Sequence, residues 1–179
     1  KQGLLHDLTK YEPIEFLTGV KYYMGDRSPN AVEKLDKGYS EAWLHHKGIN
    51  KHHFEYWLDL GYKPVGRVTG AKMPLKYVLE MACDRMAACK TYHGDAYTDR
   101  DPYDYYNNKS YAVEPFLHED TARLLRKILK LLADEGEKKA LAYMRWLLRH
   151  PEVYESNEAH EFDKEGMKLI LNKNPDEEA

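Results

Sequence analysis

Residues 121–148 read TARLLRKILKLLADEGEKKALAYMRWLL, and the apolar side chains in this stretch recur every three or four positions. Such spacing is typical of amphipathic helices that bury one face. Gly136 separates two apolar stripes, so we expect an antiparallel helical hairpin with Gly136 at its turn. The stripes are Leu124, Ile128, Leu131 and Leu132 in the first helix and Ala140, Leu141, Met144, Leu147 and Leu148 in the second.

The same helical periods cover most of the remaining chain, and no run alternates β-branched with polar residues as a strand would. Pro13 is placed to open a helix that ends near Tyr23, and Pro74 is placed to open one that reaches Tyr92. The sequence therefore predicts an all-α fold, a helical bundle with a C-terminal hairpin. The residues of the first helix that should turn inward are Ile14, Phe16 and Leu17.

The domain organisation follows from length and local composition. With 179 residues and 42% apolar content, the chain fits a single core. We expect one domain over residues 1–150 and an acidic extension over 151–179, with one helix near 159–171 and a frayed tail. A tyrosine-rich stretch over 93–115 should lie at the surface, with one short helix around 102–107.

The composition limits the classes of function. Lysine and arginine number 27 against 30 acidic residues, so the bulk charge attracts neither nucleic acid nor an anionic membrane. No apolar run approaches the roughly 20 residues that a membrane span needs. No Walker loop, dinucleotide-binding glycine motif or nucleophile elbow occurs. We expect a cytoplasmic protein in which Cys83 and Cys89 are reduced core thiols, and a homo-oligomer is compatible with these features.

Histidines and aspartates gather in the first half of the chain. Imidazole binds zinc, iron, manganese, nickel or cobalt, while carboxylates favour harder ions such as magnesium. The mixed set predicts a site for one or two divalent metal ions. Its members are His6-Asp7, His45-His46, His52-His53 and Asp84, with His45 to His52 and His46 to His53 each seven residues apart.

Each member also has a simpler explanation. Asp7 can pair with Lys10 three residues later, and exposed pairs of that kind are common and weak. A His-His dipeptide by itself is more often a solvated helix end than a ligand pair. Asp84 has no basic residue three or four positions away on its helix, so its partner must come from elsewhere or from solvent. Taken as a set, these residues favour the metal site.

Two segments resemble motifs of the HD-domain superfamily of metal-dependent phosphohydrolases. They are Leu4-Leu5-His6-Asp7-Leu8-Thr9-Lys10 and Glu80-Met81-Ala82-Cys83-Asp84-Arg85. The chain is most similar to a little-characterised bacterial and phage group of HD-like proteins, over about residues 1–101. The resemblance implies an all-helical fold in which His6, Asp7 and Asp84 are metal ligands. Members with two metals add histidines between the motifs, where His45, His46, His52 and His53 fall.

The chain departs from the superfamily at one point. The superfamily normally has a further ligand histidine on a helix before the His-Asp pair, and only five residues precede His6 here. Two alternatives stay open: that helix is missing from this sequence, or the site is built differently.

The resemblance implies a phosphomonoesterase or phosphodiesterase that acts on a small phosphorylated molecule, such as a nucleotide, through a metal-activated water. Asp7, Lys10 and Asp84 would be its catalytic residues, and Arg85 and Arg27 would bind phosphate together with Lys10. Lys10 lies one turn after His6, where it can offset charge that develops in the transition state. The alternative is a non-catalytic metal-binding or adaptor domain with a degenerate site.

Overall fold

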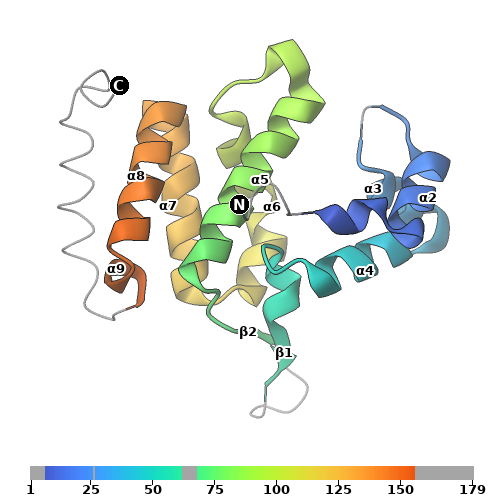
Figure 1. The fold of residues 1–179 in the computed structure, drawn as a ribbon, viewed down its shortest axis with the longest axis horizontal. Helices are drawn as coiled ribbons and strands as arrows, with labels where there is room; N and C mark the ends of the chain where they lie inside the picture. The colour runs from blue at the N-terminus through green and yellow to red at the C-terminus, as the bar shows by residue number, and fades with distance from the viewer. Residues whose placement is uncertain (1–6, 26, 62–67, 156–179) are drawn as a thin grey trace. The chain divides into compact units, whose positions relative to one another are not determined.

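The computed structural model describes residues 7–25, 27–61 and 68–155 (Figure 1). These residues form α-helices, short 3-10 helices and one two-stranded sheet, which confirms the predicted all-α fold. The chain divides into two compact units, Lys1–Leu58 and Asp59–Ala179, and each is described by itself. A single domain over 1–150 stays a prediction, and the helix predicted near 159–171 lies outside the described residues. No helix in the described part is long and apolar enough to cross a membrane.

The first unit contains α2 (Pro13–Tyr22), α3 (Pro29–Lys37) and α4 (Glu41–Ile49), with the 3-10 turns η1 (Leu8–Tyr11) before them and η2 (Phe54–Trp57) after them. Helix α2 packs against both α3 and α4. Prolines start α2 and α3, where their missing N–H costs no helical hydrogen bond. Ser40 caps α4 as predicted, because its hydroxyl accepts a hydrogen bond from the Trp43 N–H at 3.0 Å.

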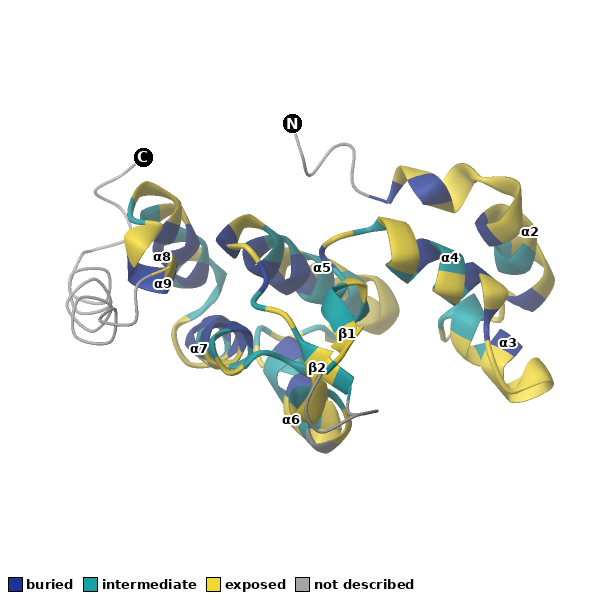
Figure 2. Ribbon diagram, turned by 90° about the horizontal axis from the view of Figure 1, so that it is seen from below, coloured by how far each residue is buried: buried dark blue, intermediate teal, exposed yellow. Residues whose placement is uncertain are grey.

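Helix α2 faces the opposite way from the prediction. Ile14, Phe16 and Leu17 are 40%, 52% and 63% exposed, so the expectation that they turn inward is wrong (Figure 2). Glu15 and Tyr22 are buried instead. They turn inward because polar partners lie there: the Tyr22 hydroxyl donates to Asp36 Oδ2 at 2.6 Å, and Glu15 contacts two histidines of α4.

The first unit has a polar interior. Among its described residues, the buried apolar side chains are those of Tyr22 and Ala42. One buried polar group is the Glu33 carboxylate, which accepts hydrogen bonds from Ser40 Oγ at 2.6 Å and from Lys37 Nζ at 2.9 Å. Buried polar groups need such partners, so hydrogen bonds rather than apolar contacts organise this unit. The other buried polar residues are Asp7, Thr9, Glu15, Ser40, His46 and His52.

The second unit is an apolar helical bundle. Strands β1 (Leu58–Leu60) and β2 (Val68–Gly70) pair at its start. The helices that follow are α5 (Leu75–His93), η3 (Gly94–Ala96), α6 (Asp101–Val113), η4 (Glu114–Phe116), α7 (Glu119–Glu135), α8 (Glu137–Arg149) and α9 (Glu152–Glu155). Helices α5, α6 and α8 all pack against α7 or against one another.

The predicted hairpin is formed by α7 and α8, with Gly136 at the turn. Leu124, Ile128, Leu131 and Leu132 are buried, as are Ala140, Met144 and Leu147. Leu148 is 58% exposed, which corrects its assignment to the inner stripe. The reason is rotation: Leu148 follows Leu147 by one residue and so points about 100° away around the helix.

Two other predictions for the second unit are corrected. The tyrosine-rich stretch forms the full helix α6, and its Tyr106 side chain is completely buried, with its hydroxyl donating to Glu114 Oε1 at 2.7 Å. Pro102 and Tyr106 thus belong to the core, whereas most of the stretch is exposed or half-buried, as predicted for a surface segment. Cys83 is an exposed free thiol and Cys89 a half-buried one, so neither is a core residue.

Candidate metal centre

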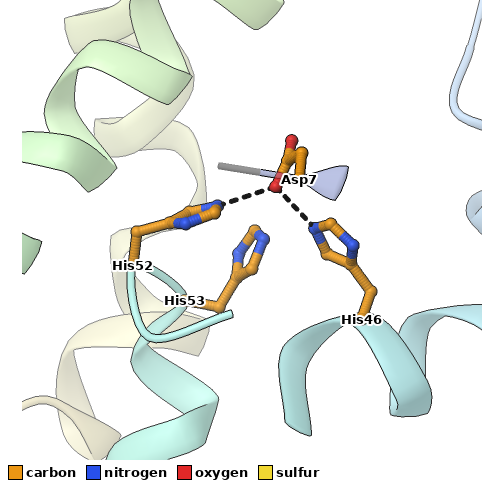
Figure 3. Close-up of side chains that lie close together, drawn as sticks. All are labelled: Asp7, His46, His52 and His53. Atoms are coloured by element: carbon orange, nitrogen blue, oxygen red, sulfur yellow. Dashed lines mark ion pairs between the residues drawn. The ribbon is translucent and has the colours of Figure 1, made fainter. Parts of the chain in front are cut away.

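Four side chains of the first unit converge on one point. Asp7, His46, His52 and His53 each place one nitrogen or oxygen atom within 4.8 Å of the others (Figure 3). Asp7 Oδ1 lies 3.3 Å from His46 Nε2 and 3.3 Å from His52 Nε2. The centroid of the His53 ring is 4.7 Å from that of His46 and 4.2 Å from that of His52. Three imidazoles thus face one carboxylate.

The local backbone explains why these residues meet. Asp7 has φ 61° and ψ 16°, and it is the non-glycine residue with positive φ in the described part of the chain. Aspartate tolerates this left-handed conformation better than most residues. Helix α4 runs through Gly48 and ends before Asn50, whose carbonyl accepts a hydrogen bond from the His53 N–H at 3.1 Å. This turn brings the His52-His53 pair back toward His46.

The cluster is shielded from solvent. Asp7, His46 and His52 are 8%, 3% and 2% exposed, and His53 is half-buried. The second oxygen of Asp7, Oδ2, forms an ion pair with Lys10 Nζ at 2.5 Å. The Lys10 side chain is 61% exposed, so this pair lies on the solvent side of the cluster. One oxygen of Asp7 therefore faces the imidazoles and the other faces a cation.

Charge and burial act in opposite directions on the pKa values of this cluster. Burial by itself would raise the pKa of Asp7, but hydrogen bonds and charges from His46 and Lys10 outweigh it and hold the pKa well below the ordinary value of 3.8. Burial would likewise lower the pKa of His46. The carboxylates of Asp7 and Glu15 outweigh that effect and raise the pKa above 6.5.

Two separations in the cluster match the distance expected between two ligands of one metal ion. With metal–ligand bonds of about 2.0–2.1 Å, two ligand atoms at corners of a tetrahedron lie about 3.4 Å apart. The two Asp7–histidine separations are 3.3 Å. Hydrogen bonds between charged groups are shorter, about 2.7–2.9 Å. The buried cluster of one carboxylate and three imidazoles can therefore hold a metal ion.

A family model described as "Family of unknown function (DUF5662)" matches residues 1–131. The chain belongs to this family. The matched residues of the DUF5662 protein include the whole of the candidate metal centre. No curated protein and no solved structure matches the chain.

The structure places the predicted site residues of this DUF5662 protein in three groups. Asp7, His46, His52 and His53 form the cluster, and Lys10 pairs with Asp7. His45 forms the second group and lies outside the cluster. His45, although next to His46 in the chain, lies between Glu15 and Glu12, with Nδ1 2.8 Å from Glu15 Oε1 and Nε2 3.1 Å from Glu12 Oε2.

The third group consists of the remaining predicted site residues, His6, Asp84, Arg85 and Arg27. His6 lies outside the described residues. Asp84 and Arg85 belong to α5 in the second unit, where the Arg85 guanidinium lies 5.6 Å from the centroid of the Tyr106 ring. Arg27 is exposed in the connection between α2 and α3. A role for Asp84 as a ligand stays a prediction.

Sequence reasoning missed Glu15. Its two carboxylate oxygens lie 2.8 Å from His45 Nδ1 and 2.8 Å from His46 Nδ1. The sequence offers one weak signal: Glu15 shares a helix face with Thr18, Gly19 and Tyr22, opposite the apolar residues. Only the knowledge that this polar face packs inward makes the signal useful.

Raising the pH should destabilise the metal-free protein through His46. A group whose pKa is raised by folding stabilises the fold below its unfolded pKa, and the contribution is lost as the pH rises through the folded pKa. For His46 this loss begins above 6.5, whereas Asp7, with its lowered pKa, contributes steadily over that range. We expect the thermal unfolding midpoint, measured with chelator, to fall from neutral to alkaline pH. The His46→Gln variant should lack this part of the decline, and an equal decline in both proteins would contradict the assignment.

Proposed function

We propose that this DUF5662 protein is a metal-dependent phosphohydrolase that acts on a small phosphorylated molecule. The observation that carries the proposal is the buried cluster of Asp7 with three histidines, next to a lysine that reaches solvent. The likeness of residues 4–10 to the His-Asp motif of the HD-domain superfamily supports the same reaction class. In this proposal Asp7 is the aspartate of that motif.

The donor set favours a transition metal. Three nitrogen donors and one oxygen donor suit zinc, iron, cobalt, nickel or manganese, whereas magnesium prefers oxygen ligands. When bound, such an ion supplies a Lewis acid for a phosphoryl oxygen and a bound water of lowered pKa. Asp7, His46, His52 and His53 would hold the ion, and the burial of Asp7, His46 and His52 limits the access of bulk water to their ligand atoms.

Lys10 is proposed to meet the phosphate. Its ammonium lies at Asp7 Oδ2, on the side of the carboxylate away from the histidines, and most of its side chain is exposed. A phosphate that approaches from solvent would meet this cation first. The same charge can then stabilise negative charge that grows on the phosphoryl oxygens.

A second candidate function is structural metal binding without turnover. The observation that favours it is that the cluster offers four protein ligands, because structural zinc sites are closed by four ligands while catalytic ones keep a position open. The two candidates differ in one measurable respect: a closed site binds metal and hydrolyses nothing.

The test is metal analysis of the purified protein combined with a panel of phosphomonoesters and phosphodiesters, assayed with zinc, iron, manganese, cobalt and nickel in turn. About one or two ions per chain with turnover of a phosphate ester is the expected result. Bound metal without turnover of any ester would favour the structural site. Absence of metal binding would overturn both candidates.

Replacing Lys10 with alanine should separate chemistry from metal binding. The variant keeps Asp7 Oδ1 and the histidines, so we expect full metal content, while turnover of the best ester should fall by about 100-fold because the cation is lost. Lys139→Ala is the matched control, since Lys139 also pairs with a carboxylate, Glu135, but lies in the second unit. Unchanged turnover in Lys10→Ala would remove Lys10 from the mechanism.

A further inference from the structure

Glu15 connects the candidate metal centre to the rest of the first unit. Its side chain is buried, and its carboxylate spans the two adjacent histidines of α4: Oε1 lies 2.8 Å from His45 Nδ1 and Oε2 lies 2.8 Å from His46 Nδ1. A carboxylate has lone pairs but no hydrogen to donate, so in both contacts the imidazole nitrogen must be the donor. Each of the two rings therefore carries a hydrogen on Nδ1.

The neighbours of His46 agree with this assignment. Asn50 Nδ2 lies 3.1 Å from His46 Nδ1, but its two hydrogens have better acceptors in Thr9 Oγ1 at 2.9 Å and the His46 carbonyl at 3.0 Å. Thr9 Oγ1 is 3.3 Å from His46 Nδ1, farther than Glu15. The shortest partner of Nδ1 is thus the carboxylate, and the remaining ring nitrogen, Nε2, points at Asp7.

We propose that Glu15 is a positioning residue that holds His46 in the Nδ1–H tautomer and so presents the lone pair of Nε2 to a metal ion. The inference rests on the proposed metal site and adds the residue that prepares one of its ligands. Histidine ligands generally donate their second N–H to a carboxylate or carbonyl, which fixes the ring and makes the ligand nitrogen more basic. Glu15 supplies that acceptor from a different helix.

The same carboxylate also distinguishes the two histidines. His45 uses Nδ1 for Glu15 as His46 does, but its Nε2 faces Glu12, whose side chain is 52% exposed. Both ring nitrogens of His45 are therefore occupied by carboxylates, one from Glu15 of α2 and one from Glu12 just before α2. Of two adjacent histidines, only His46 is left with a nitrogen for the cluster.

Three variants test the role of Glu15. Glu15→Met keeps an unbranched side chain but replaces the carboxylate with a weakly accepting thioether, and we expect the metal dissociation constant to rise by about 10- to 100-fold. Glu15→Gln should recover much of the affinity, because its amide oxygen can accept from His46 while its NH₂ donates to His45. Glu12→Met is the matched control: it removes the carboxylate that contacts His45 Nε2 and lies outside the cluster, and its metal affinity should stay within about twofold of the parent.

A second measurement does not depend on metal or on activity. Long-range nitrogen–proton NMR spectra of the metal-free protein, at alkaline pH, report which nitrogen of each histidine carries hydrogen. His46 should show the Nδ1–H tautomer in the parent and in Glu15→Gln, and should lose it in Glu15→Met.

The outcomes separate this inference from the proposed function. An Nε2–H tautomer of His46 in the parent overturns the role of Glu15, even if Glu15→Met fails to fold. Equal losses of metal affinity in Glu15→Met and Glu12→Met would also overturn it. A parent protein that binds metal but hydrolyses no ester would remove the phosphohydrolase proposal and leave the role of Glu15 intact.

Discussion

Replacing Asp7 with asparagine should lower metal affinity by more than about 100-fold, beyond the effect of losing a hydrogen-bond partner of a ligand. Asp7 is the anionic member of the cluster, and its Oδ1 lies 3.3 Å from two imidazole nitrogens. Hydrolytic activity should be lost with the metal. Isothermal titration with zinc or manganese measures the affinity directly.

The Asp7→Asn substitution should leave the backbone conformation at this position unchanged. Asp7 has the left-handed φ of 61°, which asparagine adopts as readily as aspartate does, so the chain path before η1 should be kept. Asp36→Asn is the matched control, because Asp36 lies in the same unit and accepts a hydrogen bond from Tyr22 outside the cluster. Full metal content in Asp7→Asn would show that the inner ligand set is assigned wrongly.

Removal of the metal should weaken the first unit far more than the second. The buried apolar side chains described in the first unit are Tyr22 and Ala42, so apolar burial contributes little to its stability. An ion that binds only the folded state adds about 4 kcal/mol when its concentration is 1,000 times the dissociation constant. We expect hydrogen-exchange protection over residues 8–57 to fall by about 1,000-fold on chelation.

The second unit supplies the internal control. Its core contains fully buried Ile128, Leu129 and Leu132. None of the four clustered residues, Asp7, His46, His52 and His53, lies in it. Protection over residues 75–149 should therefore be the same with and without chelator. Equal protection of the first unit in both conditions would contradict the idea that the ion stabilises it.

The helices were largely predictable because their signals are local. Prolines at 13 and 74, the serine at 40 and the apolar period around Gly136 each act within one or two turns, and each lies at or next to a helix terminus. The direction of α2 was not predictable in this way. Its apolar stripe satisfies the pattern of a buried face, but the pattern does not contain the partners that bury Glu15 instead.

The sequence predicted which types of residue form the candidate site, but not which individual residues belong to it. The sequence predicted His6, Asp7 and Asp84 as metal ligands and four further histidines as possible ones. The spacing of seven residues treats His45 with His52 and His46 with His53 as equivalent pairs. The chain breaks this equivalence at Asn50, where α4 ends and a turn replaces the helix. His45 is drawn to two glutamates, which lie 30 or more residues earlier in the chain.

The outward face of α2 affects how the unfolding of this protein can be followed. Phe16, Leu17, Val20, Tyr23 and Met24 are each more than half exposed along or just after one helix. Dyes that fluoresce on apolar surfaces should bind this stripe in the folded protein and give a bright signal before any heating. A dye-based melting curve would then start from a high baseline and record the loss of a native binding surface together with the exposure of the core. Ellipticity reports the helix content itself and does not depend on the binding of dye to this stripe.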